Sequence, residues 1–195
     1  MSTATILLAS GSPRRRTLLQ EAGFRIEVVV PEIDDASVHV HENMPERLVV
    51  SLAWFKASQI DFATRPEEVL IAADTVCDVD GTVLGKPANR DEALVMLERM
   101  FERDHRTRTG VCVRSCEGRL LFEDSTLVRM GTPSPSELEA YLDSEQWQGK
   151  AGGYNLADRI DMGWPITFDG DPTTVMGLPM ARLVPLLNEL VKHDG

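Results

Sequence analysis

The chain of 195 residues has no long apolar run. It contains no stretch of about 18 or more apolar residues, the length that a helix needs to span a bilayer. The basic residues 14–16 follow the first apolar run, residues 6–9, whereas a signal peptide places its basic residues ahead of the apolar segment. We therefore expect a soluble, cytoplasmic protein that has no membrane partner.

Cysteine is scarce, with three residues and no C-x-x-C pair. This number and spacing give neither a disulfide framework nor a zinc knuckle, so we expect Cys77, Cys112 and Cys116 to be small core residues. His39 and His41 could ligate a metal, but their stretch is polar and has no nearby thiol. The sequence therefore disfavours a metal site built on histidine or cysteine.

Basic residues are outnumbered, because 20 Lys and Arg against 31 Asp and Glu give a formal net charge of −11. Nucleic acids and anionic membranes are bound largely through neutralised phosphates, so we expect no nucleic-acid partner. A small anion can still bind, since screening limits each charge to roughly 8 Å and a local basic pocket can override a distant acidic surface. The P-loop pattern G-x-x-x-x-G-K-[ST] is absent from the sequence, which disfavours a P-loop ATPase.

Hydrophobic residues make up 43 % of the chain, enough for one globular domain over residues 1–195. Apolar runs of strand length alternate with segments of helical periodicity. The expected strands are residues 6–9, 26–30, 69–73, 107–116 and 120–130, with a hairpin turn at Asp80-Gly81. The expected helices are residues 13–22, a segment from Pro45 with Leu48, Val49, Leu52 and Phe55 inward, residues 89–100, a short one after Ser134, and residues 180–192 with a bend at Pro185. This is the pattern of a single-domain mixed α/β fold.

The first predicted helix carries arginines in its first turn, where the macrodipole disfavours cations by about 0.3–1 kcal/mol each. An anion at that helix N-terminus would compensate, if it were bound by free backbone N–H groups, the hydroxyls of Ser10 and Ser12, and the guanidinium groups of Arg14 and Arg15. A solvated basic turn with a serine cap explains these residues equally well. The segment therefore suggests a phosphate site without requiring one.

Carboxylates follow two of the predicted strands. Asp74 comes directly after residues 69–73, and the carboxyl end of a central strand is where α/β proteins usually place ligands. Asp34 and Asp35 follow the second strand in the same way. Converging carboxylates could hold magnesium or manganese, and one could orient or deprotonate water. A turn-forming or helix-capping Asp74 is the alternative.

Three lysines stand among apolar or glycine-rich residues instead of in a charged run. They are Lys56, Lys86 and Lys150. Taken singly, each has the pattern of a surface lysine. Lys86 is the most informative, because Gly85 and Pro87 fix the backbone where it is presented. The small residues after Lys150 would let a ligand or another backbone come close.

The segment 8–15, Leu-Ala-Ser-Gly-Ser-Pro-Arg-Arg, resembles the opening signature of the Maf nucleotide pyrophosphatases. Later motifs resemble those of the same family, in the same order and with compatible spacing. They are Ala73-Asp74-Thr75, Gly85-Lys86-Pro87, Thr109-Gly110-Val111, Lys150-Ala151-Gly152 and Gly177-Leu178-Pro179. The resemblance extends over essentially the whole chain.

This resemblance implies an elongated α/β fold related to the inosine triphosphate pyrophosphatases, with a cleft between two lobes. It implies hydrolysis of a nucleoside triphosphate to the monophosphate and pyrophosphate, by attack of water at the α-phosphate with Mg or Mn as cofactor. Position by position, the residues that correspond to phosphate contacts are Ser10, Ser12, Arg14 and Arg15. Lys56 and Lys86 correspond to cleft lysines, and Lys150 to a substrate-binding residue. Asp74 corresponds to the proton acceptor, and Asp35 to a metal-binding position that is more often glutamate. A homodimer, usual among relatives, is a possible assembly.

The expected base preference is mixed. Relatives that cleave dTTP and UTP have counterparts of Arg14 and Thr75, but they carry glutamine where this chain has Ala157. Asn155 or Asp158 could replace the missing amide, since either can hydrogen-bond to a base edge. Residues 170–174 resemble instead a segment of relatives that act on 7-methyl-GTP. We therefore expect a relaxed selectivity.

Two other functions compete with hydrolysis. The Maf family is also associated with the regulation of septum formation, which would act through protein binding. A phosphoryl-transferring kinase would need nucleotide motifs that the sequence does not contain. Product analysis separates a kinase from a pyrophosphatase.

Overall fold

The computed structural model describes residues 5–32, 44–62 and 69–192. Its elements, in chain order, are β1 (Ile6–Ala9), α1 (Pro13–Glu21), β2 (Ile26–Val28), α2 (Pro45–Ser58), β3 (Val69–Val79), β4 (Thr82–Leu84), α3 (Arg90–Met100), β5 (Arg103–Ser115), β6 (Gly118–Met130), α4 (Pro135–Asp143), the 3-10 turn η2 (Ala151–Gly153), α5 (Leu156–Asp161), β7 (Ile166–Asp169), α6 (Pro172–Met176) and α7 (Met180–Lys192).

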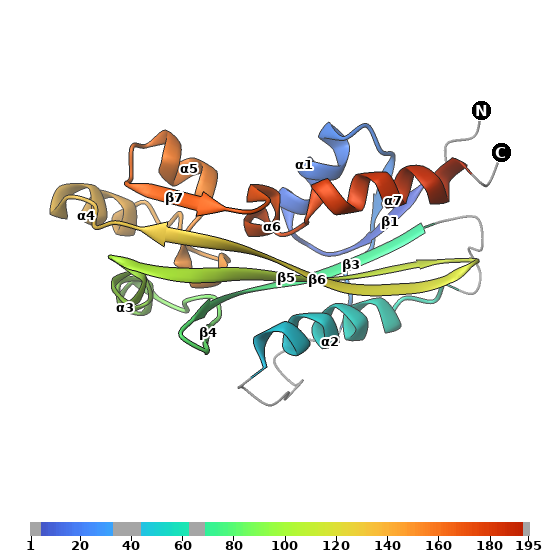
Figure 1. Ribbon diagram of the computed structural model, residues 1–195, viewed down its shortest axis with the longest axis horizontal. Helices are drawn as coiled ribbons and strands as arrows, with labels where there is room; N and C mark the ends of the chain where they lie inside the picture. The colour runs from blue at the N-terminus through green and yellow to red at the C-terminus, as the bar shows by residue number, and fades with distance from the viewer. Residues whose placement is uncertain (1–4, 33–43, 63–68, 193–195) are drawn as a thin grey trace.

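One seven-stranded mixed sheet organises the molecule, in the order β2-β1-β3-β5-β6-β7 with β4 paired to β3. β1 is parallel to β2 and β3, and all other pairs are antiparallel. The molecule is elongated, with α1 and α7 over one face of the sheet, α2 under the other, and α3, α4 and α5 at the far end (Figure 1). The predicted α/β class, a mixed sheet with flanking helices, is confirmed.

Three clusters of buried side chains hold these layers together. One lies between the sheet and the helices α1 and α7, and a second between the sheet and α2. The third fills the far end around α3 and α4 and includes Trp147 and Trp164. Complete burial of one large apolar side chain contributes about 1.5–3 kcal/mol. α1 brings two such residues, Leu18 and Leu19, to its cluster.

β3 is longer than the sequence predicts. The expectation that the strand ends before Asp74 is wrong, because β3 runs on to Val79. Pairing with β5 continues along one edge from Leu70 to Asp78, and this supports the polar residues as strand. On the other edge, pairing with β1 ends at Ala72 and pairing with β4 begins at Cys77. Asp74 and Thr75 therefore lie where, among the described residues, that edge has no neighbouring strand.

Other expectations differ in detail. The Asp80-Gly81 hairpin is confirmed, with φ of 50° and 81° at the two turn residues. In α2, Leu48 and Phe55 are only half-buried, because the small side chains of Ala53 and Ala57 form the contact face. The sequence did not predict the short elements α5, β7 and α6, whose few residues show no clear periodicity. Pro185 lies inside α7, as expected.

The cysteines are free, and their placement corrects one prediction. Cys77 and Cys112 are buried, but Cys116 is exposed in the turn between β5 and β6, where no core is present to cover it. His39 and His41 lie outside the described residues, as do Asp34 and Asp35. Among the described helices, none combines the length and the apolar character needed to cross a bilayer.

Candidate active site

A cleft lies beside the unpaired stretch of the β3 edge. It has an outer chamber of about 650 Å³ and an inner recess of about 70 Å³. The outer volume is in the range of sites that bind small molecules. The β1–α1 loop, α2, the segment after β4 and the residues before α5 form its walls, and both parts share the lining residues Ser12, Arg14, Arg15, Lys56, Lys86 and Gly149.

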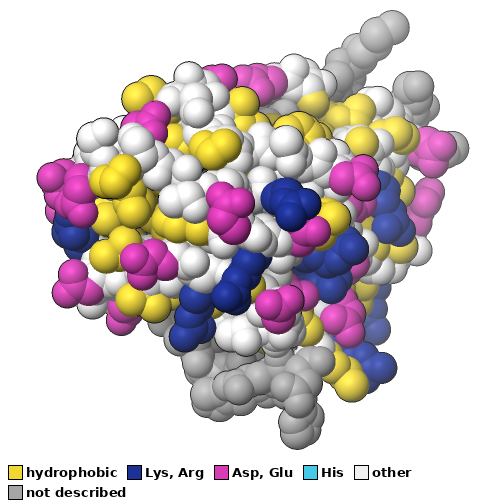
Figure 2. Space-filling model, turned by 60° about the vertical axis from the view of Figure 1, so that its left-hand side comes forward, with side chains coloured by type: hydrophobic (Ala, Val, Ile, Leu, Met, Phe, Trp, Pro, Cys, Tyr) yellow, Lys and Arg dark blue, Asp and Glu magenta, His cyan; other side chains and the backbone are white. Residues whose placement is uncertain are grey.

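The cleft is cationic although the protein is acidic. Its lining includes Arg14, Arg15, Lys56, Lys86 and Lys150 against the carboxylates Asp74 and Asp158. Figure 2 shows one face of the molecule, on which Lys and Arg side chains gather near the middle and Asp and Glu side chains are scattered around them. A local excess of positive charge within a Debye length attracts anions despite the net charge. The cleft is therefore suited to a polyanionic ligand.

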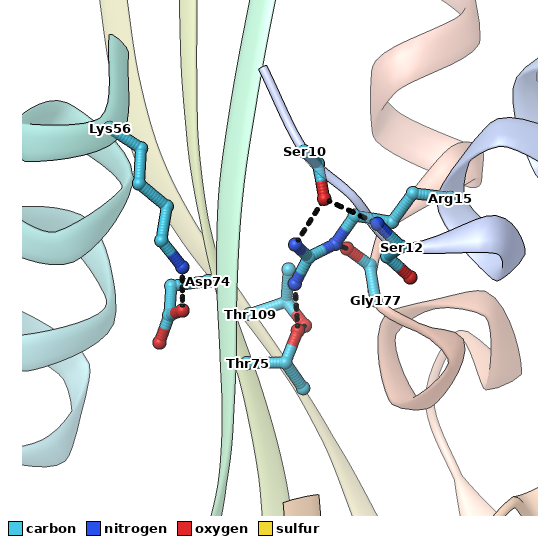
Figure 3. Close-up of polar contacts among 8 residues, drawn as sticks. All are labelled: Ser10, Ser12, Arg15, Lys56, Asp74, Thr75, Thr109 and Gly177. Atoms are coloured by element: carbon cyan, nitrogen blue, oxygen red, sulfur yellow. Dashed lines mark hydrogen bonds and ion pairs between the residues drawn. The ribbon is translucent and has the colours of Figure 1, made fainter. Parts of the chain in front are cut away.

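Asp74 and Lys56 form an ion pair at the base of the cleft. The Lys56 Nζ donates to the Asp74 Oδ1 at 2.5 Å, and the two side chains are only 14 % and 13 % exposed. Side chains alternate along a strand, so Asp74 faces α2 while Thr75 faces the opposite side of the sheet. Figure 3 shows the ion pair on one side of β3 and the partners of Thr75 on the other.

Arg15 is buried and connects three parts of the chain. Its Nε donates to the Gly177 carbonyl at 2.9 Å, and its two terminal nitrogens donate to the hydroxyls of Ser10 and Thr75, each at 3.0 Å. These bonds join the β1–α1 loop to β3 and to the segment between α6 and α7 (Figure 3). Arg15 thus shapes the cleft wall as well as lining it.

The hydroxyl groups next to Arg15 have a defined order. Thr109 donates to the Thr174 carbonyl at 2.7 Å, so its oxygen must accept in the 2.9 Å bond with Thr75. Thr75 therefore donates its single O–H to Thr109 and accepts from Arg15. The Thr75 hydroxyl is committed to holding Arg15 in place.

Ser10 and Ser12 present hydroxyls at the start of α1. The Ser10 oxygen accepts from the Ser12 backbone N–H at 3.2 Å and from Arg15, which leaves its own O–H as a donor. Ser12 occupies the N-cap position and lines the cleft, but its side chain makes no capping hydrogen bond. The helix N-terminus, predicted as a phosphate site, thus opens onto the cleft.

Arg14 and Lys150 crowd the outer chamber. Burial lowers the pKa of Arg14, and the charge of Asp158 opposes that shift. Burial, followed by repulsion from Arg14, lowers the pKa of Lys150, whose ammonium group donates to the Gln146 carbonyl. Crowded, partly desolvated cations favour a bound anion. Lys86 is exposed and lines both parts of the cleft.

α5 brings a different set of residues to the wall than the family pattern suggests. Asn155 and Asp158 line the outer chamber and are joined by a 2.7 Å hydrogen bond. Asn155 is the N-cap residue of α5 and Asp158 lies in its first turn, whereas Ala157 is not among the described residues that line the chamber. The Asn155 Oδ1 is buried without a hydrogen-bond partner in the described part of the chain.

Residues 170–174 have a structural part in this fold. The Asp171 carboxylate accepts from the Thr173 backbone N–H at 2.8 Å and from the Ala181 N–H at 3.0 Å. It therefore caps α6 and fastens the start of α7. The segment that resembles the 7-methyl-GTP type thus joins two helices and does not line the cleft described above.

Three further residues take part in the site without having been assigned a role from the sequence. Thr109 and Gly110 lie directly opposite Thr75 and Asp74 on β5. Tyr154 lines the inner recess, and its hydroxyl shares a 2.8 Å hydrogen bond with the Nε2 of the buried His105. A glycine inside a strand often marks a close approach of backbones, and that signal was available at Gly110.

The described residues contain no group of three His, Cys, Asp or Glu side chains that could hold a metal ion by themselves. Magnesium in nucleotide enzymes is usually held by one or two carboxylates together with substrate phosphates and water. The single carboxylate of Asp74, beside a cationic cleft, fits a metal that binds with the substrate. Asp35, the other expected ligand, lies outside the described residues.

Comparison with known proteins gives consistent relatives. A family model described as Maf-like protein matches residues 5–190. The dTTP/UTP pyrophosphatase of Symbiobacterium thermophilum is 37 % identical over 184 residues, which cover 94 % of this chain and 93 % of the relative. Proteins of the same name from Bacillus cereus (strain G9842) and Rhodopirellula baltica are 35 % and 39 % identical, covering 97 % of this chain and 95 % and 83 % of their own lengths.

Proposed function

Because this chain belongs to the Maf-like protein family, we propose that it hydrolyses nucleoside triphosphates, dTTP and UTP among them, to the monophosphate and pyrophosphate. The observation that carries the proposal is the partly buried Lys56–Asp74 pair at the base of a cationic cleft in an acidic protein. The named activity of the relatives supplies the substrate class.

The triphosphate binds among Ser12, Arg14, Lys86 and Lys150, which present donors to the cleft from different elements. Arginine forks and ammonium groups make charge-assisted hydrogen bonds to phosphate oxygens. The Ser10 hydroxyl adds a donor at the start of α1. Bound phosphate relieves the repulsion between Arg14 and Lys150, so substrate binding raises the pKa of Lys150 toward its ordinary range.

Asp74 accepts the proton of the attacking water. The water oxygen forms a bond to the α-phosphorus, the bond between that phosphorus and the α–β bridging oxygen breaks, and pyrophosphate leaves with the electron pair. Lys56 holds the Asp74 carboxylate in position through its hydrogen bond to Oδ1. Asp74 and, as the family pattern suggests, Asp35 would hold a divalent cation together with the phosphates, and that cation would neutralise charge.

The base occupies the outer chamber near α5. Asn155 lines this chamber, and its side-chain amide is of a type that can hydrogen-bond to a base edge. With Ala157 in place of an amide, one neutral hydrogen bond worth about 0.5–1.5 kcal/mol is missing relative to the dTTP/UTP pattern. We therefore propose relaxed selectivity, with several triphosphates cleaved within about tenfold of one another and pyrimidines among the better ones.

A panel of canonical, methylated and deaminated triphosphates, assayed with magnesium and with manganese, tests this function. Monophosphate and pyrophosphate are the expected products, and Asp74→Asn is the inactive control. Nucleoside diphosphate and phosphate would contradict the proposed reaction. A preference of a thousandfold for one base would contradict the relaxed selectivity while leaving the reaction intact.

A role in septum formation through protein binding is not favoured, because the similar proteins are named as pyrophosphatases. If a cellular role exists, the Asp74→Asn chain should fail to supply it. A single domain, a cytoplasmic location and a homodimer remain predictions for this chain, and light scattering coupled to size exclusion tests the last.

A further inference from the structure

Two consecutive residues of β5, Thr109 and Gly110, pair in the sheet with the two consecutive site residues of β3, Asp74 and Thr75. In the antiparallel register, Gly110 is directly opposite Asp74, and Thr109 is directly opposite Thr75. Directly paired residues on antiparallel strands present their side chains to the same face of the sheet. Gly110 therefore faces α2 together with Asp74, and Thr109 faces the Arg15 side together with Thr75.

Gly110 allows α2 to touch the sheet. A Cβ atom built on Gly110 would lie 2.2 Å from the carbonyl carbon and 2.3 Å from the carbonyl oxygen of Val49, and 2.5 Å from the backbone nitrogen of Val50. These are backbone atoms of the helix, so no side-chain rotation can relieve the clash. Any side chain at position 110 would force α2 away from β5.

The position of α2 determines where Lys56 lies. Val49 and Lys56 are about two helical turns apart, so they are on the same face of α2. That face carries the buried residues Val49, Ala53 and Ala57 against the sheet. A shift of α2 at Val49 therefore moves the base of the Lys56 side chain relative to Asp74, to which its ammonium is bonded at 2.5 Å.

Thr109 does the corresponding work on the opposite face. It is completely buried. Its hydroxyl accepts a hydrogen bond from the Thr75 O–H and donates one to the Thr174 carbonyl of α6. Since the Thr75 hydroxyl accepts a hydrogen bond from Arg15, this chain of hydrogen bonds holds the Arg15 guanidinium group in place. Neither Thr109 nor Gly110 lines the cleft among the described residues, so both would act through other side chains.

We propose that Thr109 and Gly110 together are the positioning element of the site: Gly110 sets the Lys56–Asp74 pair by admitting α2, and Thr109 sets Arg15 through Thr75. The proposal rests on the proposed hydrolase function for its catalytic readout. A displacement of about 1 Å remote from the reacting atoms can lower a rate on the order of 100-fold. We expect Gly110→Ala to lower kcat by about 10- to 100-fold, with a smaller effect on KM.

A double-mutant cycle with Lys56→Ala distinguishes positioning from general destabilisation. If Gly110 acts through Lys56, Gly110→Ala should lower kcat by less than about threefold in the Lys56→Ala background. The control is Gly131→Ala, whose Cβ would lie 3.0 Å from Pro165 at the far end of β6. That variant should lower the melting temperature without lowering kcat. The role of Gly110 would be overturned if Gly110→Ala lowered kcat by the same factor in the wild-type and Lys56→Ala backgrounds. A kcat of Gly110→Ala within twofold of wild type would also overturn it.

Thr109 variants keep the proposal testable if Gly110→Ala does not fold. Thr109→Val removes the hydroxyl at nearly constant volume, whereas Thr109→Ser retains it. Thr109→Val should lower kcat/KM by about tenfold or more, and Thr109→Ser should restore it to within about threefold of wild type. Equal activity of the two variants would overturn the role of Thr109.

Crystal structures separate failure of this inference from failure of the proposed function. In Gly110→Ala, α2 should retreat from β5 and the Lys56 Nζ to Asp74 Oδ1 distance should exceed the 2.5 Å of the native chain. This measurement needs no turnover. A wild-type chain that cleaves no triphosphate would reject the hydrolase, while an unmoved α2 and an intact ion pair would reject the positioning.

Discussion

The Arg15 Nε donates a 2.9 Å hydrogen bond to the carbonyl oxygen of Gly177, which lies 162 residues further along the chain. Gly177 has a φ of 112°, and a Cβ there would lie 3.0 Å from the same Nε. The first helix and the segment before the last helix are thereby joined at the cleft wall. Two motifs that are far apart in the sequence thus form one contact.

Replacing Arg15 by lysine should test this contact. Arg15→Lys keeps the charge but cannot reach Ser10, Thr75 and Gly177 at the same time. Leaving buried acceptors unpaired costs about 1–3 kcal/mol, so the free energy of unfolding in urea should fall by that amount. Arg16→Lys, on the exposed face of the same helix, is the matched control and should change stability by less than about 0.5 kcal/mol. Equal stability of both variants would contradict the bridging role.

Asp74→Asn should keep the fold and lose turnover. An amide cannot accept the proton of water, and loss of a general base typically costs about 10²–10⁴-fold. The rate of pyrophosphate release under saturating substrate measures this, with circular dichroism as the check of folding. Asp169→Asn, on an exposed position of β7, is the control. Turnover of Asp74→Asn within threefold of wild type would remove Asp74 from the reaction.

Arg14 and Lys86 should contribute to triphosphate binding. Both line the two parts of the cleft, so Arg14→Ala and Lys86→Ala should each weaken binding of a non-hydrolysable triphosphate, measured by calorimetry. Arg14→Lys keeps the charge without the bidentate geometry and should fall between Arg14→Ala and wild type. Arg16→Ala is the control. Unchanged affinity in both alanine variants would place the phosphates elsewhere.

His105 should make the fold sensitive to acid. Burial lowers the pKa of His105 to about 4, from an ordinary value of 6.5, so the folded chain disfavours the charged ring. The contribution of the neutral His105 ring to the free energy of unfolding is fully present above about pH 6.5. It is lost as the pH falls toward 4. Between pH 7 and pH 4.5 the loss from this group is about 2.5 kcal/mol.

The measurement for His105 is urea unfolding at both pH values for the wild type and for His105→Gln. The variant retains a polar partner for the Tyr154 hydroxyl but does not titrate. Carboxylate titrations are common to both chains and cancel in the difference. The wild type should therefore lose about 2.5 kcal/mol more than the variant. Parallel pH dependences would show that His105 is protonated in the folded chain at its ordinary pKa.

Asn155 should influence the choice of base. Its side chain lines the outer chamber, and its Nδ2 donates to the Asp158 carboxylate. Asn155→Ala should change the ratio of kcat/KM between UTP and ATP by about 2- to 10-fold, as expected for one neutral hydrogen bond. Ala157→Gln restores the residue that dTTP/UTP-cleaving relatives have at this position. This substitution should sharpen the preference for dTTP and UTP if the glutamine side chain can reach the base. An unchanged ratio in both variants would place base recognition on other residues.

The sequence predicted the main elements because their signals are local. Apolar runs of strand length and capping residues such as Ser134, whose side chain and Glu137 form a complete capping box, depend on neighbours a few residues away. Asp74 illustrates the limit, since the polar dipeptide that follows an apolar run looks like the end of a strand. Continuous pairing with β5 keeps it in the strand, and that pairing is decided by residues about 35 positions away.

The sequence by itself determined the family, the cationic character of the first helical turn and the chemical groups available for phosphate and proton transfer. Only the tertiary structure decided how those groups are used. In the folded chain, the Thr75 hydroxyl donates to Thr109, and the Arg15 guanidinium donates to Ser10, Thr75 and Gly177. Asn155 and Asp158, and not Ala157, line the outer chamber of the cleft. The physical reason is that a donor or a contact surface can be assigned only when its partner is within about 3–4 Å, and these partners are brought there by packing of distant segments.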